Sequence, residues 1–385
     1  MSGPAPTFNL PQDDLSTLEG HGPALVTFGE AMLRDTPADE QRPEATRLVH
    51  LSVAGSEYSI ATLAARLGVP TAYITRLPDN PYGWMVRDLA RANGVDTSAF
   101  AWADKAEPIG RYIFELGRSP RPDMGWYQRM YSAGSRLGRG MVDWGRVLRD
   151  SRILHTSGIT FGLAAHSGYS HNPWLEALEE ALQAKPAACA LGLDFNYRAT
   201  LWSEEECRRV LEPLLHQAVD CLITSVYDMA RHFGIGCGRW SAADILANRP
   251  ERLEDDDLRA FGAEVIRHFG LKQVAITLRA AENTLHHTWE SAAMDAEGHF
   301  FRSPCPRPMI IADRLGGGDA WCGGFYYGLL TGGSPVDGLA KGVMVGDAAA
   351  RLKQTLMFDL PMMNRSDLQT VLAADAAGVG HQTIR

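Results

Sequence analysis

Short apolar segments alternate with longer amphipathic ones along most of this 385-residue chain. The apolar segments have the composition of buried parallel strands, and the segments between them have the apolar spacing of helices. Long alternation of this kind predicts an α/β fold with a doubly wound, mostly parallel sheet flanked by helices. We expect strands at 24–30, 71–75, 153–157, 189–195, 221–224 and 273–278, and helices at 56–68, 82–93, 172–184, 203–216, 225–233 and 255–269.

Composition and charge exclude several classes of protein. The net charge of −9 argues against non-specific nucleic-acid binding, which needs a basic surface, so we expect no nucleic-acid partner. No apolar run reaches the roughly 18 residues of a membrane span, so we expect no membrane partner. Six scattered cysteines without a C-x-x-C pair fit a reducing compartment, and we expect a cytoplasmic protein.

The alternating pattern is interrupted in a few places. Residues 1–22 are rich in Pro, Gly, Asp and Ser and lack a signal-peptide pattern, which predicts a disordered or loosely docked lead before an α/β domain at 23–375 and a tail at 376–385. Aromatic residues with Pro120 and Pro122 at 108–131 predict exposed strands of a small accessory sheet. The polar segment 236–254 is interpreted as a solvated surface insertion without a function.

A glycine-rich segment, Asp313-Arg-Leu-Gly316-Gly317-Gly318-Asp319, precedes a predicted helix at 320–330. Glycines that lead into a helix N-terminus present free N–H groups and the positive end of the helix dipole, which is a site for an anion. Asp319 would repel a phosphate, but it can deprotonate a hydroxyl that lies between itself and the phosphate. The alternative is a flexible loop in which Asp319 only begins the helix, and the segment alone leaves both open.

The segment Asp313–Asp319 resembles the D-T-x-G-A-G-D signature of the ribokinase/fructokinase (PfkB) family of sugar kinases. Arg314 and Gly317 depart from the Thr and Ala of that signature. The resemblance implies a ribokinase-like fold with an inserted β-sheet lid, at about 30–53 and 105–135. It also implies that Asp319 is the catalytic base and that Gly316, Gly317 and Gly318 form the anion hole.

Three further segments resemble sugar-binding parts of the family. The turn at 53–57 resembles its N-terminal Gly-Gly motif, with Ala54 in place of the first glycine and Ser59 where Asn is common. Segments 194–203 and 126–135 resemble the D-x-N-Y-R…L-W-S and Y-x-R-x-x-S-A-x-S runs of the 2-keto-3-deoxygluconate kinase branch. The plain alternatives are a capped helix start, a turn with a surface Arg, and aromatic strand packing. The substrate-binding residues that this resemblance implies are Gly55, Ser59, Tyr112, Tyr127, Arg129, Asn196 and Arg198.

The nucleotide side departs most from the family pattern. Ser225 and Asp228 resemble the N-x-x-E motif, which implies nucleotide binding by Ser225 and Mg²⁺ binding by Asp228; a favourable charge at a helix start is the alternative. Thr277 and Arg279 stand near the family's G-x-x-G turn against the nucleotide, with Gly316 and Gly318 on the phosphate side. Arg279 and Glu282 replace both glycines of that turn, so we expect weak ATP binding.

These residues together predict an ATP- and Mg²⁺-dependent kinase that phosphorylates a hydroxyl of a sugar or sugar acid, with 2-keto-3-deoxygluconate as the first candidate. Two alternatives remain: a kinase for fructose, ribose or a nucleoside, and a non-catalytic sugar-binding relative with an impaired nucleotide site. The resemblance further allows a monovalent cation as cofactor and a homodimer formed through the β lid.

Overall fold

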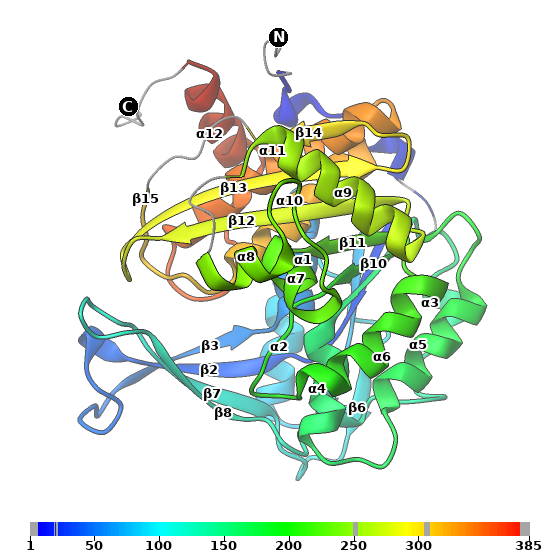
Figure 1. Ribbon diagram of the computed structural model, residues 1–385. Coiled ribbons are helices and arrows are strands. Elements are labelled where there is room, and N and C mark those ends of the chain that lie inside the picture. The colour runs from blue at the N-terminus through cyan, green and yellow to red at the C-terminus, as the bar shows by residue number, and fades with distance from the viewer. Residues whose placement is uncertain (1–6, 19, 21, 249–252, 304–308, 378–385) are drawn as a thin grey trace.

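The main sheet has nine strands in the order β14-β13-β12-β11-β10-β9-β1-β4, with β15 paired to β13 (Figure 1). The computed structural model describes residues 7–18, 20, 22–248, 253–303 and 309–377. All neighbours from β4 to β12 are parallel, and β13 pairs antiparallel with β12, β14 and β15. The strands are β1 (Leu25–Phe28), β4 (Thr71–Ile74), β9 (Ile153–Ser157), β10 (Ala190–Asp194), β11 (Cys221–Thr224), β12 (Gln273–Ala281), β13 (His286–Asp295), β14 (Phe300–Arg302) and β15 (Met309–Ile310). The predicted doubly wound, mostly parallel sheet is confirmed.

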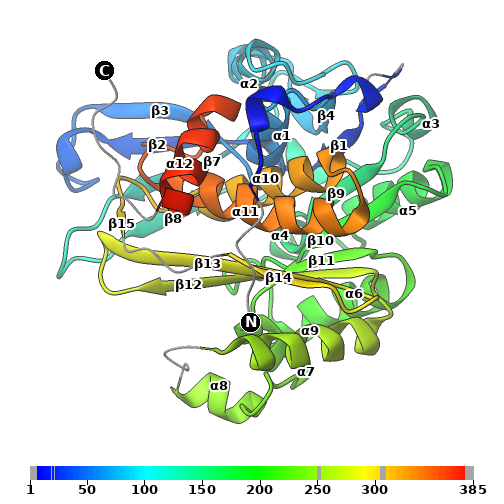
Figure 2. The ribbon, with the colours of Figure 1, turned by 90° about the horizontal axis from the view of Figure 1, so that it is seen from above.

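Helices cover both faces of this sheet (Figure 2). On one face lie α1 (Ser56–Arg66), α10 (Gly317–Thr331), α11 (Pro335–Gln354) and α12 (Arg365–Ala377). The other face carries α3 (Trp144–Val147), α4 (Gly158–His166), α5 (Pro173–Ala184), α6 (Glu204–Gln217), α7 (Val226–Phe233), α8 (Ala242–Asn248) and α9 (Asp255–Phe269). Helix α2 (Pro81–Ala92) packs beside the small parallel pair β5 (Arg76–Pro78) and β6 (Ala101–Ala103). Each face therefore has its own hydrophobic core.

A separate four-stranded sheet projects beside the main body, in the order β3-β2-β7-β8 (Figure 1). Its strands are β2 (Met32–Pro37), β3 (Val49–Ala54), β7 (Gly110–Glu115) and β8 (Met124–Gln128), which we call the lid. Strand β8 is exposed throughout, as expected, but β7 is mostly buried. Strand β7 lies between β2 and β8, and its Tyr112 and Phe114 pack with Leu315 of the glycine-rich segment. The expectation of exposed strands over 108–131 is therefore wrong for β7.

Helices α10 and α11 approach so closely that glycine is required between them. A Cβ on Gly328 would stand 2.2 Å from the backbone nitrogen of Gly342. Helix α10 begins at Gly317, three residues before the predicted start, because Gly316 adopts a left-handed conformation with φ of 76° and acts as the N-cap. Gly317, Gly318 and Asp319 therefore lie in the first turn of a helix and not in a loop.

The described parts of the N-terminal lead and of the segment 236–254 both pack against the domain. The described part of the N-terminal lead is docked: Leu10 is fully buried, and Asp13 forms an ion pair of 2.6 Å with the buried Lys341 of α11. The segment 236–254 is not merely solvated, because its described part contains α8 and buries Cys237, Ile245 and Leu253 in the core. Apolar residues spaced among the polar ones in each segment provide this packing.

The five cysteines among the described residues are all buried free thiols, and Cys305 lies outside the described residues. In the part of the chain that the structure describes, none of the helices has the length and apolarity needed to cross a membrane.

Candidate active site

A cavity of about 650 Å³ opens at the carboxyl ends of β10, β11 and β12, in front of the first turn of α10. Ligands of open α/β sheets bind at this edge, because strand ends and helix N-termini meet there. The cavity brings together expected residues from four distant segments, which are Asn196, Arg198, Ser225, Asp228, Thr277, Arg279, Gly316, Gly317, Gly318 and Asp319.

The first turn of α10 presents free backbone N–H groups to this cavity. The first intrahelical hydrogen bond runs from the N–H of Ala320 to the carbonyl of Gly316, at 2.9 Å. The N–H groups of Gly317 and Gly318 precede that bond, and a Cβ on Gly318 would meet no atom within 4 Å. This turn can therefore accept an anion against its N–H groups and the helix dipole.

Asp319 lies in the same turn and is held by a serine from another helix. Ser56, the first residue of α1, donates its hydroxyl to Asp319 Oδ1 at 2.6 Å. Burial raises the pKa of Asp319 to about 6, against the effect of the Ser56 hydrogen bond and the nearby positive charges of Arg198 and Lys353. A carboxylate poised near neutral pH is suited to accept a proton from a hydroxyl. Gly55 occupies the N-cap position of α1, which leaves the hydroxyl of Ser56 for Asp319.

Three carboxylates line the cavity, and the charges of Asp319 and Asp228 disfavour ionisation of Asp194. Burial, followed by the charge of Asp319, raises the pKa of Asp194 to about 8, and burial also raises the pKa of Asp228. Arg198 lowers the pKa of all three groups, since its positive charge favours their ionised forms. Arg198 is therefore a counter-charge common to Asp194, Asp228 and Asp319.

Asp228 has the surroundings of a cation ligand. It lies at the start of α7, where its N–H donates to Ser225 Oγ at 3.1 Å and the Ser225 hydroxyl donates to Asp228 Oδ2 at 2.7 Å. Carboxylate oxygens suit Mg²⁺, which is usually held by one or two carboxylates together with substrate phosphates and waters. Among the described residues, the three cavity carboxylates do not converge on one point, which fits such an open site better than a closed protein cage.

The other expected sugar-binding residues lie outside this cavity. Tyr127 and Arg129 line a second hollow, of about 530 Å³, between the lid and α4. Tyr112 is buried, stacks on Tyr127 with ring centroids 5.0 Å apart, and donates its hydroxyl to Asp359 at 2.9 Å. Gly55 adjoins Ser56 at the start of α1, whereas Ser59 is fully buried and lines neither cavity.

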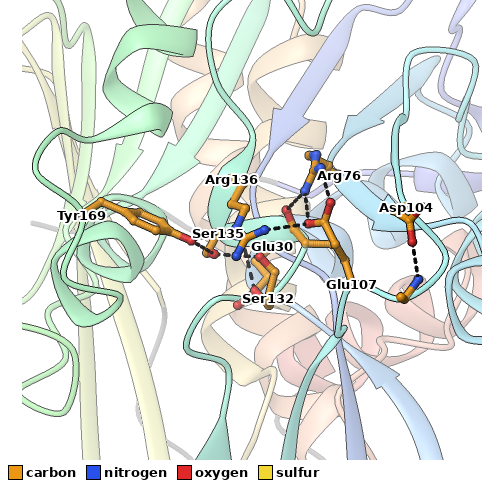
Figure 3. A network of polar contacts seen from close by, with 10 residues as sticks. Glu30, Arg76, Asp104, Glu107, Ser132, Ser135, Arg136 and Tyr169 are labelled. Atoms are coloured by element: carbon orange, nitrogen blue, oxygen red, sulfur yellow. Dashed lines mark hydrogen bonds and ion pairs between the residues drawn. The ribbon is translucent and has the colours of Figure 1, made fainter.

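Arg129 has a carboxylate partner inside the protein. Its guanidinium donates to Glu30 at 2.8 Å, and both side chains are almost fully buried. Glu30 also accepts from Ser132, and Figure 3 shows how Ser135, Tyr169, Arg136, Glu107 and Arg76 extend this polar network at the base of the lid. The charge of Arg129 is thus balanced before any substrate enters.

Several cavity residues were not anticipated. Ile245 and Leu253, from the segment assigned no function, line the cavity, as do Leu278 and Trp289. The turn expected at 279–282 is also displaced. Strand β12 continues to Ala281, and Arg279 pairs with Trp289 across the hairpin. The N–H of Glu282 then donates to the carbonyl of His286 at 2.9 Å. The alternation of polar Thr277 and Arg279 with apolar Leu278 and Ala280 was the available sign of a longer strand.

Comparison with known proteins shows which family the chain belongs to. The model of the pfkB family of carbohydrate kinases matches residues 23–360. The chain belongs to the pfkB carbohydrate kinase family. It is therefore a sugar kinase, and the predicted ribokinase-like fold and phosphoryl-transfer class are confirmed.

Individual relatives extend along nearly the whole chain. A 2-dehydro-3-deoxygalactonokinase of Haloferax volcanii is 30% identical over 92% of this chain and 98% of its own length. The crystal structure of a 2-dehydro-3-deoxygluconokinase from Thermotoga maritima has a TM-score of 0.79 and 31% identity, over 91% of this chain and 99% of that one. An uncharacterised Pyrococcus horikoshii sugar kinase in complex with ATP shares the fold at 17% identity, with a TM-score of 0.65 over 90% of this chain and 99% of that one.

Proposed function

We propose that this kinase transfers the γ-phosphoryl group of ATP to a hydroxyl of a 2-keto-3-deoxy sugar acid, with 2-keto-3-deoxygluconate or its galacto epimer as acceptor. The observation that carries the proposal is the meeting of Asp319, the N–H groups of Gly317 and Gly318, and Arg198 in one cavity. The names of the Haloferax and Thermotoga relatives support the sugar-acid class, and the ATP complex of the Pyrococcus kinase supports the nucleotide.

The roles follow from the chemistry of each group. Asp319 accepts the proton of the attacking hydroxyl, and the first turn of α10 stabilises negative charge that develops on the transferred group. Asp228 would hold Mg²⁺, which when bound neutralises phosphate charge. Arg198 lies exposed at the cavity wall, where its planar fork can pair with the carboxylate of an acid sugar.

The preference for an acid depends on Arg198 more than on Arg129. Glu30 already balances the charge of Arg129, so this arginine offers a substrate carboxylate less net attraction. A coupled ADP-release assay over a panel of sugar acids and neutral sugars tests the proposal. Turnover of 2-keto-3-deoxy acids well above that of fructose, ribose and nucleosides is expected; preference for a neutral sugar would contradict it.

The nucleotide is proposed to lie along β12 and the wall formed by Ile245, Leu253 and Trp289. Arg279, on the cavity side of β12, can offer a phosphate a charge-assisted hydrogen bond in place of a glycine turn. We expect Mg-ATP affinity to be weak and strongly dependent on Mg²⁺. Calorimetric titration with and without the acid sugar measures it, and tight binding without Mg²⁺ would contradict this part.

Oligomeric state and compartment complete the proposal. Exposed apolar side chains on the lid include Leu51, Trp126 and Tyr127, with Leu48 and Met130 next to its strands, and a second copy of this chain would bury them in a homodimer through the lid. Light scattering after gel filtration should give a dimer mass, and a monomer at micromolar concentration would contradict this. The free thiols fit a cytoplasmic setting.

A further inference from the structure

A lysine lies buried behind the first turn of α10. Lys353, in the last turn of α11, has no exposed surface, and its Cε would lie 3.2 Å from a Cβ placed on Gly316. Its ammonium group donates to the carbonyl of Leu356 at 3.4 Å. Lys353 thus approaches the residue that caps the phosphate-binding turn, on the side away from the cavity.

Two carboxylates compensate the charge of Lys353. Burial lowers the pKa of Lys353, while the negative charges of Asp313 and Asp359 raise it. The same carboxylates bind Arg34, whose guanidinium lies 2.6 Å from Asp313 Oδ2 and 2.8 Å from Asp359 Oδ1 and is wholly buried. Two cations and two carboxylates therefore form a balanced cluster, which is the condition for charges to remain buried.

The cluster also determines the shape of the glycine-rich segment. Asp313 accepts the N–H of Leu315 at 3.0 Å and the N–H of Phe358 at 3.1 Å. The backbone carbonyl of Asp359 lies so close to Gly316 that a Cβ there would stand 2.2 Å away. Any group that holds Asp313 and Asp359 in place therefore holds the turn that carries Gly317 and Gly318.

The described residues behind this turn do not fit the monovalent cation expected from the family resemblance. Such an ion needs oxygen ligands, and the oxygens near Gly316 and Lys353 include the carboxylates of Asp313 and Asp359 and the backbone carbonyls of Asp359 and Leu356. The two carboxylates already pair with Arg34 and feel the charge of Lys353, and the Leu356 carbonyl accepts from Lys353. An added ion would place three positive charges against two carboxylates away from water, at a large desolvation cost.

We propose that Lys353 takes the place of a monovalent cation, so that its ammonium group holds the phosphate-binding turn and makes phosphoryl transfer independent of K⁺. The inference rests on the proposed function, because it assigns the support of that same site. Lys353 touches no reacting atom and is a positioning residue: it acts through Gly316, Gly317 and Gly318.

The unmodified protein gives the first test. Turnover of the preferred acceptor is measured in chlorides of K⁺, Na⁺ and tetramethylammonium at equal ionic strength, and kcat is expected to agree within about twofold. Activation by K⁺ of about tenfold or more over tetramethylammonium would overturn the proposal.

Two substitutions separate charge from volume. Lys353→Met retains the length but removes the charge, and is expected to lower kcat about tenfold or more without rescue by K⁺. Lys353→Ala leaves an opening among the same oxygens, so K⁺ or methylammonium should restore part of its activity. Lys341→Ala is the matched control, since Lys341 is equally buried on α11 but pairs with Asp13, and it should show no response to K⁺. Unchanged kcat in Lys353→Met would overturn the proposal.

A readout without turnover separates this inference from the proposed function. The Tm of the wild-type protein should be the same in K⁺ and tetramethylammonium, whereas Lys353→Ala should gain about 2 °C or more from K⁺. K⁺-specific stabilisation of the wild type would overturn the inference even if no sugar acid is phosphorylated. If no acceptor is phosphorylated but these Tm results hold, only the proposed function fails. If Lys353→Ala does not fold, the wild-type comparison still decides.

Discussion

Ser56 Oγ donates a hydrogen bond of 2.6 Å to Asp319 Oδ1 across 263 residues of sequence. The bond joins the first turn of α1 to the first turn of α10, and so connects the candidate base to the turn that follows the lid strand β3. The hydroxyl favours the ionised form of Asp319, while burial opposes it and raises the pKa to about 6. The protonation state of the base is therefore coupled to the position of α1.

The first prediction concerns this bond. Ser56→Ala removes a donor to the charged carboxylate, so the pKa of Asp319 should rise, by about one unit for a hydrogen bond to a charged group. The acidic limb of the pH profile of kcat/KM, near pH 6 in the wild type, should move up in pH. Ser56→Thr, which retains the hydroxyl, should leave the limb in place, and an unmoved limb in Ser56→Ala would contradict the assignment.

Asp319 itself gives the second prediction. Asp319→Asn retains the size of the side chain but cannot accept the proton, so kcat should fall about 10²-fold or more. Mg-ATP affinity and Tm should remain close to wild type, because the first turn of α10 keeps its N–H groups. Turnover near the wild-type level on the preferred acceptor would exclude Asp319 as the base.

The third prediction concerns the charge of the substrate. Arg198→Ala removes the proposed partner of a sugar carboxylate, so KM for an acid sugar should rise about 10- to 100-fold, and KM for a neutral sugar should change little. Kinetics are best compared at pH 8, because loss of Arg198 also raises the pKa of Asp319. Arg267→Ala, on the exposed surface of α9, is the control. Equal effects on acid and neutral sugars would argue against carboxylate recognition.

The fourth prediction is a dependence of stability on pH. Burial raises the pKa of Asp194 from an ordinary value of 3.8 to about 8, so the folded protein keeps a proton that the unfolded chain releases. The favourable contribution of Asp194 is therefore complete below about pH 4 and is lost as the pH rises through about 8. Asp194→Asn should abolish this loss and raise Tm at pH 8.5 by about 2 °C or more.

Thermal unfolding from pH 5 to pH 8.5 checks the fourth prediction. Asp244→Asn is the control, because hydrogen bonds from Ser241 lower the pKa of Asp244 and no loss over this range is expected. The same fall in Tm with pH for Asp194→Asn and wild type would show that Asp194 does not retain its proton.

Much of the fold was predictable because its signals are local. Periodicity placed β9 at 153–157, β11 at 221–224 and α9 at 255–269 at the residues where the structure has them. The glycines before Asp319 indicated an anion site because glycine can adopt a positive φ whatever residues surround it. Gly316 adopts such a φ. Arg198, Ser225 and Asp228, which the resemblance assigned separately, lie together because the carboxyl ends of parallel strands share one edge.

The remaining features depend on contacts between distant segments, which no local pattern records. Arg129 and Arg198 looked equivalent in sequence, but Glu30 neutralises one and the other faces the cavity. Segment 236–254 has a polar composition, yet its Ile245 and Leu253 line the same cavity as Trp289 of the hairpin strand β13. The sequence by itself determined which side chains are available for phosphoryl transfer. Only the tertiary structure decided the charge states of these side chains. Burial and the partners from other elements determine the free energy of ionising each group, as Ser56 does for Asp319 and Asp313 does for Lys353.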